Sequence, residues 1–231
     1  MKKTLFLVTS FVFALSLVLF PSFTPTAAKA ATSSSVTQHV QLKTLYVDIS
    51  YNPSTQKLVK STEQNGTTTV TVVNKQTGEE IDEFGEKDSQ SKVQSKLSLA
   101  GTIQPLSGFY DTASIYHTKT LGSIKARLYT VMKVYHSGSF TQINSIKDHY
   151  WQEGSSGPWR LESEHSSAIS ASSGFPTTSV RTSGTAVVTV TTQHSGEFSA
   201  SALEVLGFSV SSGGEYNARK SISLGYTYSV Q

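Results

Sequence analysis

The chain has 231 residues, of which 19 are basic and 16 acidic, and it has a formal net charge of +3 and no cysteine. The absence of cysteine excludes disulfide bonds and a lipid-modified bacterial anchor, since that linkage needs a cysteine at the cleavage point. The small net charge provides no global field that would attract nucleic acid, so nucleic acid is not expected as a partner.

The first 30 residues have the pattern of a secretory signal peptide. Lys2 and Lys3 precede an apolar run over residues 5–20, and a small-residue exit follows at residues 28–30. The apolar run is short for a bilayer span of roughly 20 residues, which favours cleavage over an uncleaved anchor. We expect cleavage after Ala30 and a secreted, extracellular protein in the style of a Gram-positive bacterium. Removal of residues 1–30 leaves 16 basic and 16 acidic residues, a nearly neutral chain.

Residues 31–39 are small and polar without periodicity, and we expect a flexible lead there. Residues 40–84 predict a small N-terminal β-unit, a β-meander. Alternating apolar side chains over residues 45–51 indicate a half-buried strand. Asn65-Gly66 predicts a tight hairpin turn, and a second turn is expected at residues 75–80. A unit of this size buries little core alone, so we expect it to pack on another part of the protein.

Dense charge over residues 85–98 predicts a linker spanning residues 85–106, with a short helix as the alternative. Residues 107–231 form the expected C-terminal domain, rich in Ser, Thr, Gly and aromatic residues. One expected strand there begins at Ile124 and another runs over residues 221–230. Only residues 199–207 indicate a helix, with Gly207 as its end and a short strand as the alternative. Short strands separated by Gly/Ser turns predict an all-β fold, an antiparallel β-sandwich or open barrel.

The sequence contains no motif of a catalytic site. The nucleophile elbow G-x-S-x-G and the glycine-rich phosphate-binding loops are both absent. The residue types that bind metal ions are present in the C-terminal domain: His136, Asp148, His149, Glu162, Glu164, His165 and His194. Their spacing matches no metal motif, since Glu162 and Glu164 are expected on one face of a strand and His165 on the other. We therefore expect neither a metal nor another cofactor.

Aromatic residues give the best local indication of a binding site. Two tryptophans lie at the two ends of a predicted turn, and two tyrosines share the polar face of a predicted strand with a lysine. Such rings cover the C–H faces of sugars, and the lysine would meet an anionic group. The alternative is that both tryptophans pack in the core. The candidate ligand-binding residues are Tyr129, Lys133, Tyr135, Tyr150, Trp151 and Trp159.

These observations favour a secreted, non-catalytic binding or structural module whose partner is a cell-wall polymer or another extracellular glycan. The second hypothesis is a β-pore-forming toxin, which the chain resembles in its Ser/Thr-rich alternating strands, with residues 178–201 as the inserting hairpin. A membrane is an expected partner only under that second hypothesis. The third is a secreted hydrolase, whose candidate carboxylates are Glu162, Glu164, Glu197 and Glu204 by number alone.

Overall fold

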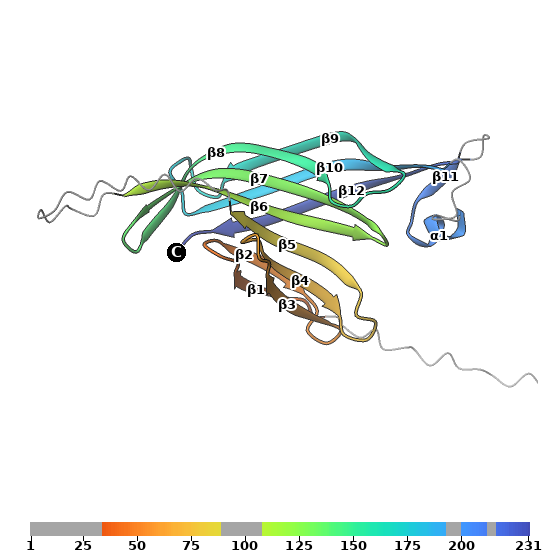
Figure 1. Ribbon diagram of the computed structural model, residues 1–231, viewed down its shortest axis with the longest axis horizontal. Coiled ribbons are helices and arrows are strands. Elements are labelled where there is room, and N and C mark those ends of the chain that lie inside the picture. The colour runs from red at the N-terminus through yellow and green to blue at the C-terminus, as the bar shows by residue number, and fades with distance from the viewer. Residues whose placement is uncertain (1–33, 89–107, 193–199, 212–215) are drawn as a thin grey trace, which may run out of the picture. The chain divides into compact units, whose positions relative to one another are not determined.

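The computed structural model describes residues 34–88, 108–192, 200–211 and 216–231, which form two antiparallel sheets in a β-sandwich-like fold (Figure 1). This confirms the predicted all-β class. The predicted signal peptide and residues 89–107 lie outside the described residues. The elements in chain order are β1 (Val36–Gln41), β2 (Tyr46–Tyr51), β3 (Gln56–Thr62), β4 (Thr68–Asn74), β5 (Glu80–Asp88), β6 (Phe109–Leu121), β7 (Ile124–Ser137), β8 (Phe140–Glu153), β9 (Trp159–Ser170), β10 (Ser179–Thr192), α1 (Ala200–Val205), β11 (Ser209–Ser211) and β12 (Tyr216–Ser229).

One sheet, called sheet B, is a meander in which strands β3 to β8 pair in chain order. Both turns predicted in its first half are confirmed. Gly66 has a φ of 83°, and the Asn65 side chain accepts a hydrogen bond of 2.8 Å from the backbone N–H of Thr67, which fixes the β3–β4 turn. Gly78, with a φ of 74°, serves the β4–β5 turn, because glycine adopts this conformation without a steric penalty.

The other sheet, called sheet A, has the order β1-β2-β12-β10-β9, with β11 also paired to β12. Strand β12 pairs with β10 along its whole length, whereas β2 joins β12 only at Val47–Tyr228 and Tyr46–Ser229. The expected N-terminal β-unit, residues 40–84, therefore contributes β2 and the end of β1 to sheet A, and β3, β4 and the first part of β5 to sheet B. Each sheet is shared with strands from later in the chain.

Two expected boundaries are corrected by the structure. Residues 36–39 were expected in a flexible lead but belong to β1, which pairs with β2 over its full length. Every residue of β1 except Val40 is exposed, so no apolar alternation marks this strand in the sequence. Residues 85–88 were expected to start a linker but continue β5, where they pair with β6. Gly85 and Glu86 of this segment are buried.

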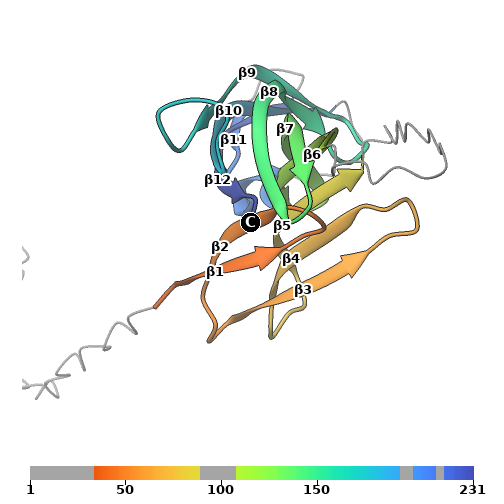
Figure 2. The ribbon, with the colours of Figure 1, turned by 90° about the vertical axis from the view of Figure 1, so that its left-hand side faces the viewer.

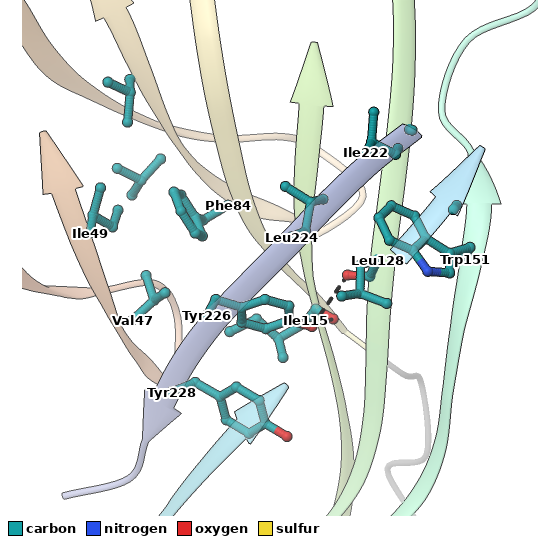
Figure 3. Close-up of a cluster of buried hydrophobic side chains, with 14 of the residues drawn as sticks. Val47, Ile49, Phe84, Ile115, Leu128, Trp151, Ile222, Leu224, Tyr226 and Tyr228 are labelled. Carbon is teal, nitrogen blue, oxygen red and sulfur yellow. Dashed lines mark hydrogen bonds between the residues drawn. The ribbon is translucent and has the colours of Figure 1, made fainter. Parts of the chain in front are cut away.

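The core lies between the two sheets and is built from the inward-facing residue of each alternating pair (Figure 3). Five apolar residues on one face of β7 are at most 1% exposed: Ile124, Ala126, Leu128, Met132 and Val134. On β12 the inward residues Ile222, Leu224, Tyr226 and Tyr228 are also buried, whereas the intervening Ser221, Ser223 and Gly225 are exposed. The two strands expected to begin at Ile124 and to run over residues 221–230 are thus confirmed as β7 and β12.

A small group of hydroxyls joins the sheets inside this core. The Thr130 hydroxyl of β7 lies 2.7 Å from that of Thr182 on β10 and 3.0 Å from that of Tyr226 on β12. The Tyr226 hydroxyl also donates to the carbonyl of Leu128 over 3.2 Å (Figure 3). Every polar atom named here has a partner, as a buried polar group requires.

A buried carboxylate fastens the β1–β2 turn to sheet B. Glu86 of β5 is 3% exposed. It accepts hydrogen bonds from the backbone N–H groups of Lys43 and Thr44, both at 2.9 Å, and of Leu45 at 3.1 Å. The hydroxyl of Thr44 donates to the same carboxylate. Converging backbone N–H groups form a site suited to an anion, so the Glu86 side chain takes the place of a bound anion here.

Strands β8 and β9 bring the sheet edges together on one side (Figure 2). The Ser166 hydroxyl donates to the backbone carbonyl of His149 over 3.1 Å, and an isolated bridge pairs Ile143 with Thr177. These contacts make the β6–β12 portion resemble an open barrel. The predicted helix is confirmed as α1. Just after its last residue, Gly207 has a φ of 76°, and its backbone N–H donates a hydrogen bond to the carbonyl of Glu204. No helix in the described ranges has the length and apolar character to cross a membrane.

Candidate functional site

The outer face of sheet B carries five tyrosines on three neighbouring strands. They alternate with the inward core residues of β6, β7 and β8, so the register that buries the core also turns these rings outward. We call this set the tyrosine array: Tyr110, Tyr116, Tyr129, Tyr135 and Tyr150.

The middle row of the array crosses all three strands. Tyr116 pairs with Tyr129, and Tyr129 pairs with Tyr150, in direct cross-strand register. The ring centroids are 5.1 Å apart in the first pair and 5.2 Å apart in the second, where the rings stack at 11°. Tyr116 and Tyr129 are buried by their neighbours, while Tyr150 is 37% exposed. Tyr150 on β8, the last strand of the sheet, is therefore the ring of this row that is exposed to solvent.

The row is held in place by residues of β5 and β7. The Tyr116 ring lies over Gly85, and a Cβ at Gly85 would overlap the ring. The Arg127 guanidinium lies 4.9 Å from the Tyr116 ring centroid, a cation–π contact, and also pairs with Glu83 at 3.3 Å. Burial raises the pKa of Tyr116 above its ordinary value, and the Glu83 carboxylate raises it further. Tyr116 thus stays a neutral phenol.

The second row lies toward the start of β6 and is more exposed. Tyr110 pairs with Tyr135, with ring centroids 5.1 Å apart, and Tyr110 is 51% exposed. The ammonium of Lys133 lies 3.9 Å from the Tyr110 ring centroid and makes no ion pair within the described residues. The Tyr135 ring covers Gly108 as Tyr116 covers Gly85. The row therefore combines an exposed ring with a cation that has no anionic partner among the described residues.

Further aromatic and basic groups surround this second row. Phe140 is 53% exposed and meets Tyr135 edge to face, with centroids 6.5 Å apart. Lys147 donates to the Thr112 hydroxyl over 2.9 Å, and Thr112 pairs with Lys133 across the strands. Two lysines and several rings thus gather at the same end of β6, β7 and β8.

The structure brings four of the six predicted site residues to this face: Tyr129, Lys133, Tyr135 and Tyr150. The other two are corrected. Trp151 is 5% exposed and Trp159 is 6% exposed, so both indoles belong to the core and form no surface platform. Trp151 follows Tyr150 directly and so points to the opposite face of β8, where its Nε1 donates to the His165 carbonyl over 3.0 Å.

Sequence reasoning missed Tyr110, Tyr116, Phe140 and Lys147. The alternation of Tyr110, Thr112, Ser114 and Tyr116 in β6 was the signal available for the first two. Lys147 was hidden by irregular register, since β8 shifts against β7 on both sides of residues 145–146 and the period of two is lost there.

The residues considered for metal binding or hydrolysis in the sequence analysis do not form such a site in the part of the chain that the structure describes. Among the described residues, no group of three or more His, Asp or Glu side chains is placed to hold a metal ion. Glu162 pairs with Arg160 at 2.7 Å and with Arg219 at 2.9 Å. A hydrogen bond from Thr189, followed by Arg160 and Arg219, lowers the pKa of Glu162 against the opposing effect of burial. A lowered pKa is the reverse of what a general acid in glycoside hydrolysis requires. His194 and Glu197 lie outside the described residues.

The segment considered as an inserting hairpin, residues 178–201, contributes the long strand β10. In this structure β10 pairs with β12 on one side and with β9 on the other. Its residues Val180, Ala186, Val188 and Val190 are in the core. Residues 193–199 lie outside the described part of the chain.

Comparisons of the chain with protein-family models, with curated proteins and with solved structures found no match.

Proposed function

We propose that this protein is a secreted, non-catalytic module of a bacterial surface that binds a glycan polymer of the cell wall through the tyrosine array. The observation that carries the proposal is the second row of the array, where Tyr110 is 51% exposed beside the Lys133 ammonium at 3.9 Å. An exposed ring offers an apolar face to sugar C–H groups, and an unpaired cation attracts an anionic substituent.

The array is suited to binding because its rings are fixed before a ligand arrives. Tyr135 is held between Tyr110 and Phe140, and Tyr150 is stacked on Tyr129. Side chains that are already ordered lose little conformational entropy on binding, which leaves more of the contact energy for affinity. Burial raises the pKa of Tyr150, and Tyr129 and Asp148 raise it further, so its hydroxyl remains a hydrogen-bond donor at neutral pH.

A pull-down on purified cell wall tests the proposal with wild-type protein and the variants Tyr110→Ala, Tyr150→Ala and Lys133→Gln. Loss of one ring is expected to weaken binding by about tenfold, the equivalent of roughly 1.4 kcal/mol. Lys133→Gln should weaken binding at low salt and flatten its dependence on salt, because screening acts on the charge that is removed.

Phe175→Ala is the matched control, since Phe175 is an aromatic residue that is 41% exposed and is not part of the array. It should be retained like the wild type. Equal retention of all variants, or retention of none including the wild type, rejects the proposal. Release of dye from liposomes by the wild-type protein, without wall binding, would favour the pore-forming alternative.

A further inference from the structure

A groove of about 300 Å³ lies on the outer face of sheet A, between β2 and β10 and across β12. It exists because β2 leaves β12 after only two paired positions, while β10 follows β12 throughout. Figure 3 shows β2 and β12 diverging from the point where Val47 lies near Tyr228. The groove is on the opposite sheet from the tyrosine array.

Two cross-strand rows line the groove. Arg181 of β10 pairs with Thr227 of β12, and Ser183 pairs with Gly225. Asp48 and Ser50 of β2 form the facing wall. The middle strand thus supplies small side chains to the floor, and the outer strands supply the walls.

Neither close packing nor backbone conformation requires a glycine at position 225, on the floor of the groove. A Cβ at Gly225 would meet only the Thr182 carbonyl oxygen, at 3.7 Å, which is an ordinary van der Waals contact. Its φ also lies outside the range that favours glycine. The absence of a side chain at this position therefore has one evident effect, which is the depth of the groove.

The two walls carry opposite charges that do not neutralise each other. Arg181 is exposed and takes part in no hydrogen bond or ion pair with any residue that the structure describes. Asp48, also exposed, accepts a hydrogen bond of 2.7 Å from Nδ1 of His39 and makes no ion pair with Arg181. A ligand with only a negative charge would be attracted by the Arg181 wall and repelled by the Asp48 wall, and a ligand with only a positive charge would experience the reverse.

We propose that this groove binds a small zwitterionic ligand, a free amino acid or a short peptide with free ends. The ligand carboxylate pairs with the Arg181 guanidinium and the ligand ammonium with the Asp48 carboxylate, while Ser50, Ser183 and Thr227 offer hydroxyls between them. Arg is suited to this role because its planar donors match a carboxylate in pairs. A volume of about 300 Å³ matches the lower end of known small-molecule sites.

Titration of the protein with glycine, diglycine and triglycine, followed by amide NMR shifts, tests this proposal. We expect saturable shifts from at least one probe at residues of β2, β10 and β12 beside the groove. Arg181→Gln and Asp48→Asn should each weaken binding by about tenfold or more, because each removes a charged hydrogen-bond partner. Gly225→Val should abolish binding by filling the floor.

Ser221→Val is the matched control for Gly225→Val, since Ser221 lies on the same exposed face of β12 but outside the groove. It should bind the probes like the wild type. Thermal unfolding of each variant shows whether the fold is retained, and the exposed Arg181→Gln substitution keeps the test decisive if Gly225→Val unfolds. The proposal is overturned if no probe gives saturable shifts, if N-acetylglycine amide binds as well as glycine, or if Arg181→Gln leaves affinity unchanged. Because the groove and the tyrosine array lie on different sheets, either result leaves the proposed glycan binding untouched.

Discussion

Thr130 of β7 and Tyr226 of β12 are hydrogen bonded across the interior of the sandwich, with 3.0 Å between their hydroxyl oxygens. Thr130 is fully buried, and Tyr226 is 5% exposed. The pair links sheet B to sheet A, and Thr182 extends the link to β10. Buried polar groups of this kind stabilise a fold only while each keeps its partners.

Tyr226→Phe is expected to lower the free energy of unfolding by about 1–3 kcal/mol, because the ring still packs while buried oxygens lose a partner. Urea unfolding measures this as a lower midpoint with an unchanged slope. Tyr150→Phe is the control, since no hydrogen bond of the Tyr150 hydroxyl is found within the described residues. It should change stability by less than about 0.5 kcal/mol. Equal midpoints for the two variants would show that the link contributes nothing.

Glu86→Gln is expected to destabilise the protein by about 1–3 kcal/mol, because an amide brings hydrogen-bond donors to a site that already presents three backbone N–H groups. The β1–β2 turn should also be cleaved faster by proteases, since its fastening to β5 is weakened. Unfolding curves and limited proteolysis measure the two effects. Glu79→Gln, an exposed change in the β4–β5 turn, should have neither effect. Unchanged cleavage of the turn in Glu86→Gln would contradict the assigned role.

Asp82 is expected to make stability depend on acid pH. Burial alone raises the pKa of Asp82, but the hydrogen bond and charge of His117, followed by Lys119, lower it below its ordinary value of 3.8. A carboxyl whose pKa is lower in the folded state stabilises the fold above its unfolded pKa and ceases to do so as pH falls through the folded pKa. The difference in unfolding free energy between wild type and Asp82→Asn should therefore be largest above about pH 4 and shrink below it.

Unfolding at a series of pH values from 7 to 2 tests the Asp82 prediction. Glu164→Gln, an exposed acidic residue, serves as the control and should follow the wild type throughout. A difference between wild type and Asp82→Asn that stays constant over the series would show that the His117 and Lys119 contacts do not hold the carboxyl ionised.

Gly85→Ala is expected to destabilise the protein by about 1–3 kcal/mol, because the added methyl overlaps the Tyr116 ring and forces it to move. The ring signals of Tyr116 and its neighbour Tyr129 should shift in NMR spectra together with the loss of stability. Gly174→Ala is the matched control, since a Cβ there has no neighbour within 4 Å. Equal stability of both variants would mean that the position of the Tyr116 ring does not depend on the absence of a side chain at Gly85.

The strands that the sequence predicts well are those with one buried face. β7 and β12 alternate cleanly because every second residue contacts the core, and this pattern is local. β1 is exposed on both faces and is held mainly by its pairing with β2, so nothing in its own residues marks it. Membership in one sheet or the other depends on partners far along the chain and was not predictable from periodicity.

In the candidate site, too, the features that follow from local alternation were predictable and those that depend on strand register were not. Tyr129, Lys133 and Tyr135 alternate on one strand, and their common face follows from the period of two. Tyr150 and Trp151 are consecutive on β8 and cannot share a face, which the platform hypothesis overlooked. Because β8 shifts register twice against β7, the alternation of inward and outward residues is interrupted between Ile143 and Trp151 and cannot be followed in the sequence.

The pairing of Val47 with Tyr228 bears on the order of folding events. Sheet B joins each strand to the one before it, so its hairpins form from contacts between neighbours and assemble early. Among the described strands, only β12 joins the β1–β2 hairpin to the rest of sheet A. This pairing has to wait until β12 has been synthesised and placed beside β10, which requires a long chain closure. Sheet A is thus expected to close after sheet B, and the backbone edge of β2 that later joins β12 stays open to pairing with other chains until then.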